Sequence, residues 1–153
     1  GIGTLIEVCK KLPNIQFVFA GSGQLEDEIE KIPNIKNVGF HTGNKLEILI
    51  REARFSVYPS EWYENCPFSV MESQTYGTPV IGANIGGIPE LIQNDITGLL
   101  FQSGSEQDLA EKISYLWENK DKNEKMHESC KNVNFYKIKE YYEKIFGVYE
   151  ATK

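Results

Sequence analysis

The sequence predicts an α/β domain with a Rossmann-like, three-layer α/β/α arrangement and a mainly parallel sheet. The first observation is that short apolar runs alternate along the chain with longer amphipathic segments, which is typical of βαβ units. The second is that no repeat, low-complexity tract or linker interrupts this alternation, so residues 1–153 are expected to form a single domain. Since βαβ crossovers are right-handed, a doubly wound sheet is the favoured topology.

The first part of the chain reads as a helix followed by two strand–helix repeats. Leu5, Ile6 and Cys9 recur at helical spacing, and the turn pair at 13–14 ends that helix. The glycines after the first apolar run lead directly into a charged helical segment. The expected elements are, in order, a helix over 4–11, a strand over 15–20, a helix within 21–32, a strand over 35–40 and a helix within 41–53.

The second part continues the same alternation. Pro67 is placed at the first position of a helix that Gly77 closes, because proline suits a helix start and glycine a helix end. Ser105 and Asp108 form a capping-box pattern at the start of a later helix. The expected elements are a strand over 55–60, a helix over 67–77, a strand over 79–83, a helix over 88–95, a strand over 98–101, a helix over 105–120 and two further helical stretches.

Charge and cysteine content narrow the class of protein. The net charge of −6 and pI of about 5.0 argue against nucleic acid or an anionic membrane surface as the primary partner. No apolar run approaches the ~20 residues that cross a bilayer, and no signal-peptide pattern opens the chain. The three cysteines are scattered and odd in number, which predicts neither a disulfide framework nor a zinc site. We therefore expect a cytoplasmic location.

Four loops that follow the predicted strands carry glycine, small polar residues or carboxylates. Ligands of doubly wound folds bind outside the carboxyl ends of the strands, so all four loops are expected to face one crevice. The convergence of the four loops is stronger evidence for a binding site than any single loop. They lie at 21–23, 41–43, 61–67 and 84–87.

The first loop, with Gly21 and Gly23, permits close approach of a phosphate to the backbone. It lacks the third glycine of a dinucleotide fingerprint, so a plain strand-to-helix turn remains an equal alternative. The fourth loop, with Gly86 and Gly87, leads into another helix start. There Glu90 could bind a ligand or simply complement the helix dipole.

The helix opened by Pro67 is the central feature of the predicted crevice. Its first N–H groups, at Phe68 and Ser69, lack intrahelical partners and can bind an anion without a side-chain cation. Glu72 follows Ser69 by three positions, so both lie on one helical face, which we expect to meet the ligand. A core helix would account for the apolar residues but not for a glutamate in its middle.

Glu64 lies in the loop before this helix, eight positions from Glu72. Either glutamate alone is ordinarily a solvated surface group. Together, beside one helix N-terminus, they are suited to accept hydrogen bonds from sugar hydroxyls. Their spacing does not favour a shared-proton dyad. No Lys or Arg occurs from Phe55 to Glu111, so any charge on a bound phosphate must be neutralised by another segment.

Cys66 raises the alternative of a nucleophilic cysteine. Such a residue needs a base, and the only histidines are His41 and His127, the latter in a distant Lys/Glu-rich stretch. A small buried residue at a turn is the favoured interpretation of Cys66.

The stretch "ENCPFSVMESQTYGTPVIGANIGGIPELI", followed by "NDITGLLF", resembles the nucleotide-sugar-binding half of retaining, GT-B-fold glycosyltransferases of family 4. "FVFAGSGQLEDEI", "IKNVGF", "LIREARFSVYPSEWYENCPF" and "DLAEKI" resemble the same family in the expected order, so the resemblance covers essentially the whole chain. One departure is that the family usually has small residues at the positions of Ser73, Gln74, Thr75 and Tyr76. The packing around these positions is therefore expected to differ from that in the family.

The resemblance implies one half of a GT-B fold and assigns roles to individual residues. Glu64 would contact the transferred sugar as the catalytic carboxylate, and Glu72 would hold the ribose hydroxyls. The remaining substrate-binding positions that it implies are Gly21, Gly23, Phe40, His41, Pro67, Phe68, Ser69, Gly86 and Gly87. No metal and no cofactor are expected. The reaction would move a sugar from a nucleoside diphosphate sugar to a hydroxyl acceptor with retention of configuration, in cell-surface polysaccharide or glycolipid synthesis.

The resemblance also implies that parts of the enzyme lie outside this chain. The family's Arg/Lys pair for the diphosphate would precede Gly1, so we expect a domain truncated at its N-terminal edge and inactive alone. A glycan or lipid-linked acceptor, and any peripheral contact with the inner face of the membrane, would belong mainly to the other half. The alternatives are a non-catalytic Rossmann-type nucleotide-binding or receiver-like signalling domain, and a different GT-B enzyme such as an epimerase or inverting transferase.

Overall fold

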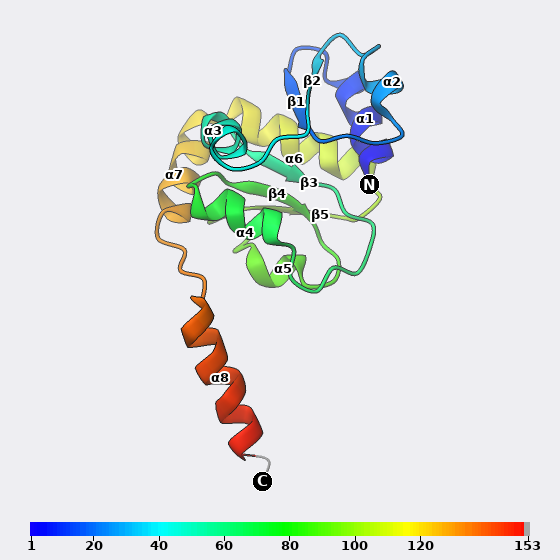
Figure 1. The fold of residues 1–153 in the computed structure, drawn as a ribbon. Coiled ribbons are helices and arrows are strands. Elements are labelled where there is room, and N and C mark those ends of the chain that lie inside the picture. The colour runs from blue at the N-terminus through cyan, green and yellow to red at the C-terminus, as the bar shows by residue number, and fades with distance from the viewer. Residues whose placement is uncertain (152–153) are drawn as a thin grey trace.

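The computed structural model describes residues 1–151 (Figure 1). All strands are short, as expected for a sheet buried between helices. They are β1 (Phe17–Ala20), β2 (Ile35–Gly39), β3 (Ser56–Tyr58), β4 (Val80–Ala83) and β5 (Gly98–Phe101). Each predicted strand is therefore present, although β1 and β3 are two to three residues shorter than expected and β2 and β4 are one residue shorter.

Helices connect the strands throughout, so the α/β class is confirmed. Those that precede β4 are α1 (Ile2–Lys11), α2 (Glu26–Ile29), α3 (Asn44–Glu52) and α4 (Phe68–Thr75). Those that follow it are α5 (Ile88–Leu91), α6 (Glu106–Glu118), α7 (Lys120–Cys130) and α8 (Ile138–Ala151). The predicted cap of α6 is confirmed, because the Ser105 hydroxyl accepts a hydrogen bond from the Asp108 N–H at 3.2 Å.

The strands form two parallel sheets rather than the one continuous sheet that was expected. One contains β1 and β2, and the other contains β3, β4 and β5 in that order. Figure 1 shows the β1–β2 pair set apart from the other three strands. β1 and β3 flank the boundary and do not pair with one another, while the predicted parallel pairing is present within each sheet.

Helices nevertheless give the domain its layers. In Figure 1, α6 lies on one side of the β3–β4–β5 sheet, and α4 and α5 lie on the other. α1 packs against α6, and both helices contribute fully buried side chains such as Ile6, Val8, Leu109 and Ile113 to one hydrophobic core. This core joins the two sheets, because α1, which leads into β1, shares it with α6, which covers β5.

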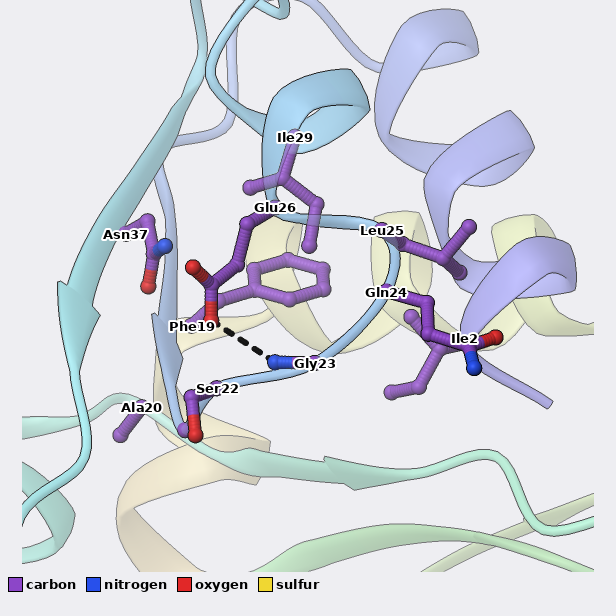
Figure 2. A pocket seen from close by; sticks show the side chains of 11 residues that line it. Ile2, Phe19, Ala20, Ser22, Gly23, Gln24, Leu25, Glu26, Ile29 and Asn37 are labelled. Atoms are coloured by element: carbon purple, nitrogen blue, oxygen red, sulfur yellow. Dashed lines mark hydrogen bonds between the residues drawn. The ribbon is translucent and has the colours of Figure 1, made fainter.

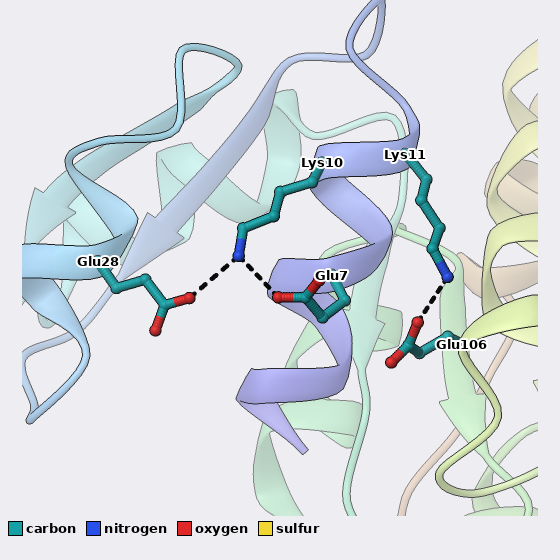
Figure 3. Close-up of polar contacts among 5 residues, drawn as sticks. All are labelled: Glu7, Lys10, Lys11, Glu28 and Glu106. Carbon is teal, nitrogen blue, oxygen red and sulfur yellow. Dashed lines mark hydrogen bonds and ion pairs between the residues drawn. The ribbon is translucent and has the colours of Figure 1, made fainter.

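Ion pairs at the C-terminal end of α1 add to this connection (Figure 3). Lys10 bridges Glu7 and Glu28, whereas Lys11 contacts Glu106 at the start of α6. The two carboxylates raise the pKa of Lys10, chiefly because its ammonium donates hydrogen bonds to Glu7 and then to Glu28. Lys11 thus ties the β1–β2 side of the molecule to the helix layer of the other sheet.

The last helix, α8, extends away from the rest of the molecule (Figure 1). None of its described residues is buried. Among the helices of residues 1–151, none is long and apolar enough to cross a lipid bilayer.

Candidate functional site

The loops at the carboxyl ends of the strands meet in two pairs. The Gly21 N–H donates at 2.8 Å to the carbonyl of Gly39, the last residue of β2, which joins the first loop to the end of the strand that precedes the second. The Gly87 N–H donates to the Glu64 carbonyl at 2.6 Å, which joins the third loop to the fourth. The boundary between the two sheets therefore also separates the two pairs of loops.

The first loop borders a hollow of about 230 Å³ that has mainly apolar walls (Figure 2). Phe19, Leu25 and Ile29 supply much of the apolar lining. The Gly23 N–H donates to the Glu26 carboxylate at 2.7 Å, so an incoming phosphate would compete with this carboxylate for it. The local geometry of Gly23 is that of a strand-to-helix turn, which was the alternative that the sequence left open.

The second loop presents Phe40 and His41 at the end of β2. The Phe40 side chain is 75% exposed although it is a large aromatic group, and His41 is half-buried. An exposed aromatic side chain beside a glycine-rich loop is available for stacking on a flat ligand.

The third loop ends at Pro67, which is the N-cap of α4 and not its first helical residue as predicted. The buried Pro67 ring has an extended backbone with φ −70° and ψ 112°. Its carbonyl accepts from the Val70 N–H at 3.1 Å, which begins the helical ladder. The N–H groups of Phe68 and Ser69 precede this first bond, so the predicted placement of free donors at the helix start still follows.

Ser69 and Glu72 line the same cleft, as their spacing on one helical face predicts. This cleft of about 680 Å³ lies between the sheets, and Ala20 and Tyr58 border it at the carboxyl ends of β1 and β3. Glu72 is exposed, so its carboxylate can meet a polar ligand without the cost of burying an unpaired charge.

Tyr58 is a site residue that the sequence reasoning missed. It is the last residue of β3 and lines the cleft with Ser69 and Glu72. Burial raises the pKa of its phenol, the nearby Glu64 charge raises it further, and a hydrogen bond with Ser69 partly opposes both. Tyr58 therefore lies between the Glu64 loop and α4. Its position at the carboxyl end of a parallel strand was the signal that could have identified it.

Gly86 and Gly87 hold the Glu64 loop by allowing its backbone to approach closely. A Cβ on Gly86 would lie 2.6 Å from the Glu64 carbonyl oxygen, and one on Gly87 would lie 1.9 Å from that of Asn65. Gly86 also has φ +58°, which favours glycine. The Gly87 N–H donates to the Glu64 carbonyl, so this donor is already used within the protein. These glycines act here as a close-packed support for Glu64.

Cys66 is exposed, so the interpretation of a buried turn residue was wrong. Its sulfur lies 3.5 Å from the Met71 sulfur. His127 is engaged elsewhere, with Nε2 2.8 Å from the Arg54 carbonyl oxygen. His127 therefore does not form a Cys–His pair with Cys66 among the described contacts.

Among the described residues that line the cleft, Arg54 is the one Lys or Arg. Arg54 lines the same cleft but precedes β3, and its guanidinium stacks 4.8 Å from the centre of the Trp117 ring. Lys10 and Lys11 are held by the carboxylates shown in Figure 3. Within residues 1–151, no three His, Cys, Asp or Glu side chains are grouped so that they could hold a metal ion.

A protein-family model described as "Glycosyl transferases group 1" matches residues 1–133. The chain belongs to this family. Longer proteins are similar to it: the amylovoran biosynthesis glycosyltransferase AmsK of Erwinia amylovora is 29% identical over 126 residues, covering 72% of this chain and 31% of its own length. The sulfoquinovosyl transferase SQD2 of Arabidopsis thaliana is 32% identical over 127 residues, covering 78% of this chain and 24% of its own length.

Solved structures agree on the fold. The Anabaena protein Alr3699/HepE in complex with UDP superimposes with a TM-score of 0.77 at 22% identity, covering 86% of this chain and 39% of that one. This likeness shows that the two chains share a fold over the matched region. The group 1 chain described here thus spans less than half the length of the relatives and structures it matches.

Proposed function

We propose that this chain is the nucleotide-sugar-binding domain of a retaining, family 4 glycosyltransferase. The full-length enzyme would transfer a sugar from a nucleoside diphosphate sugar to a hydroxyl of a glycan or lipid-linked acceptor. The observation that carries the proposal is the convergence of Ser69, Glu72 and Tyr58 on one cleft, beside the Glu64 loop. These groups combine carboxylates for hydroxyl groups with a helix N-terminus for phosphate.

Glu72 is the proposed ligand for the ribose. An ionised carboxylate accepts hydrogen bonds from two neighbouring hydroxyls, and such charge-assisted bonds are stronger than neutral ones. Its position on the exposed face of α4, one turn from Ser69, places it within the cleft but open to solvent.

The start of α4 is the proposed site for the diphosphate. Pro67 ends the preceding loop. The N–H groups of Phe68 and Ser69 point along the helix axis at the N-terminal end of α4, where the helix dipole is positive. Gly21 and Gly23 would approach the same phosphates from β1, while Phe40 and His41 would border the base. Positive charge for the leaving diphosphate would come from outside residues 55–111, which contain no Lys or Arg.

Glu64 is the proposed catalytic carboxylate that contacts the transferred sugar. Gly86 and Gly87 pack directly against the Glu64 backbone, so the side chain extends from a fixed backbone position. We propose retention of configuration, with the leaving diphosphate accepting the proton of the acceptor hydroxyl. We also propose that transfer needs no metal ion or cofactor.

Named relatives support the substrate class. Structures of the Anabaena protein hold UDP and UDP-glucose, and AmsK is named for amylovoran biosynthesis. By analogy we propose a role in cell-surface polysaccharide or glycolipid synthesis, at the cytoplasmic side of the membrane with peripheral contact through other parts of the enzyme.

A thermal-shift panel on the full-length protein tests donor binding. UDP, GDP, ADP and their sugars are compared in the wild type, in Glu72→Ala and in Glu124→Ala, an exposed helical glutamate of α7 that does not line the cleft. Glu72→Ala removes the acceptor of the charge-assisted hydrogen bonds from the ribose hydroxyls, so nucleotide binding should weaken about tenfold or more. Glu124→Ala should behave as wild type. Equal shifts in all three proteins would remove Glu72 from the ribose site.

Transfer itself is tested by product analysis. NMR of the anomeric proton should show retained configuration, Glu64→Gln should lose most transfer while keeping nucleotide binding, and EDTA should leave the rate unchanged. If the wild-type enzyme binds nucleotide but transfers sugar to no hydroxyl acceptor, a non-catalytic nucleotide-binding domain is favoured instead. The isolated chain is expected to bind weakly and not to transfer.

A further inference from the structure

The loop from Pro59 to Pro67 joins β3 to α4 and carries Glu64, the proposed catalytic carboxylate. Its second half is fixed by the Gly87 N–H, which donates to the Glu64 carbonyl at 2.6 Å. Because loops are more mobile than helices and strands, a loop of this length needs contacts at more than one point to hold a side chain in place. Other elements of the domain supply contacts to its first half.

The first half of the loop is attached to α1 by a side-chain hydrogen bond. The Thr4 hydroxyl, in the first turn of α1, donates to Glu61 Oε1 at 2.6 Å. This is the separation of a charge-assisted O–H···O⁻ bond, which is roughly twice as strong as a neutral one. Thr4 is half-buried and β-branched, so its side chain has few rotamers. The Gly1 nitrogen lies 3.8 Å from the same oxygen, too far for a hydrogen bond. Thr4 therefore holds the Glu61 carboxylate directly.

Two further contacts fix the loop just before Glu61. The start of α1 lies beside the end of β3 (Figure 1), and a Cβ on Gly1 would lie 1.5 Å from the Pro59 carbonyl oxygen. The Ser103 hydroxyl, after β5, donates to the Ser60 carbonyl at 3.0 Å. The hydrogen bond to Glu61 therefore acts on a segment whose preceding backbone is already in contact with α1 and with the end of β5.

A tight turn connects this anchored segment to Glu64. The Trp62 N–H donates to Ser60 Oγ at 3.2 Å, and the Glu64 N–H donates to the Trp62 carbonyl at 2.9 Å. Glu64 follows Glu61 by three positions, and each residue advances the chain by at most ~3.6 Å. A shift of the Glu61 backbone would therefore reach Glu64 with little chain between them to absorb it.

We propose that Thr4 and Glu61 are positioning residues for the catalytic carboxylate Glu64. The inference rests on the proposed function, in which Glu64 contacts the transferred sugar. Catalysis is sensitive to such support, since a displacement of about 1 Å caused by a distant change can lower a rate about 10²-fold. The ribose ligand Glu72 lies within α4 itself, so its position does not depend on the first half of the loop. Loss of the Thr4 hydrogen bond is expected to slow transfer and to spare nucleotide binding.

Steady-state kinetics of the full-length protein test the proposal with three variants. Thr4→Val removes the hydroxyl but keeps the size and branching of the side chain, whereas Thr4→Ser keeps the hydroxyl. Lys10→Met is the control, because it removes an exposed contact at the other end of α1. Thr4→Val should lower kcat about tenfold and leave KM for the nucleotide sugar within about twofold. Thr4→Ser and Lys10→Met should keep the wild-type kcat. A wild-type kcat for Thr4→Val, or an equal loss in Thr4→Ser, would overturn the proposal.

Amide hydrogen exchange on the same proteins gives a measurement that does not need transfer. The N–H groups of Trp62 and Glu64 should exchange about tenfold faster in Thr4→Val, because the turn that holds them opens more often. The N–H of Ile81, in the buried strand β4, should keep its wild-type rate, which would exclude general unfolding as the cause. Unchanged exchange at Glu64 would overturn the proposal alone. Wild-type transfer by Glu64→Gln would overturn the proposed function, and with it the role of Thr4 in transfer.

Discussion

The two sheets of this domain are built from similar residues but differ in burial. β1 reads Phe-Val-Phe-Ala and β4 reads Val-Ile-Gly-Ala. Every residue of β4 is buried, and Ile81 is 0% exposed, whereas Val18 in the middle of β1 is 52% exposed. The difference arises because β4 has a strand on each side, while β1 pairs with β2 alone.

This comparison shows that the apolar character of a strand does not determine how far it is buried. A strand is covered by its neighbours and by helices on both faces, and one absent neighbour exposes backbone and side chains together. Measurements on the full-length protein can show how far the two sheets differ.

Thiol labelling compares local opening on the two sides of the molecule. Cys9 lies in α1 beside the β1–β2 sheet, and Cys130 lies with Sγ 3.4 Å from the Thr97 carbonyl oxygen beside β5. Burial raises the pKa of both thiols to about 12, so at pH 8 both are protonated and unreactive in the folded state. We expect both to label on the order of 10³-fold more slowly than exposed Cys66, measured by mass spectrometry of peptides. Fast labelling of Cys9 alone would show that the β1–β2 side opens independently.

The same thiols predict a loss of stability at alkaline pH. A raised folded-state pKa means that the native state keeps protons that the unfolded state has lost between about pH 9 and 12. The free energy of unfolding should therefore fall over this range, by about 1.4 kcal/mol per pH unit for each thiol. Denaturant titrations of the wild type and of Cys9→Ala measure this slope. An unchanged slope in the variant would contradict the assignment to Cys9.

Deleting side chains from one strand of each sheet measures the packing difference directly. Ile81→Ala removes a side chain with 0% exposure and should lower the free energy of unfolding by about 2–5 kcal/mol. Val38→Ala in β2, where the side chain is only half-buried, should cost about 1 kcal/mol or less. Denaturant unfolding of the full-length variants provides both values, and similar costs would erase the contrast between the sheets.

Adding one methyl group to a glycine tests close contact in the two sheets. A Cβ on Gly98 of β5 would lie 2.0 Å from the Val80 carbonyl oxygen, whereas one on Gly23 after β1 meets no atom within 4 Å. Gly98→Ala should therefore cost about 1–3 kcal/mol in free energy of unfolding. Gly23→Ala should change it by about 0.5 kcal/mol or less. A harmless Gly98→Ala would mean that β4 and β5 pair less closely than the structure has them.

The smallest effect concerns the ion pair that connects the two sides. Lys11→Met removes the contact with Glu106 but keeps an apolar stem of similar length. Both side chains are substantially exposed, so the free energy of unfolding should fall by about 1 kcal/mol or less. The loss should diminish in high salt, which screens exposed charges. A larger, salt-independent loss would indicate that the Lys11 stem, and not its charge, joins α1 to α6.

Much of the fold was predictable from local signals. The apolar runs around Phe17, Ile35, Val57, Ile81 and Leu99 each form a strand, because short apolar segments between turn residues have few other stable uses. The start of α4 was misplaced by one residue at Pro67, since proline is acceptable both at the N-cap and at the first helical position. Cys66 was expected to be buried and is exposed, because nothing in a loop sequence specifies which side chains the fold covers.

The α/β class, the order of the elements and the placing of Ser69 with Glu72 on one helical face could be predicted from the sequence. These properties depend on periodicity and spacing within a single segment. The packing of the folded chain was needed to show that Tyr58 lies with them, that Gly86 and Gly87 support the Glu64 loop, and that a hollow separates β1 from β3. Those properties arise between segments that are distant in the chain, where contact depends on packing rather than on any local pattern.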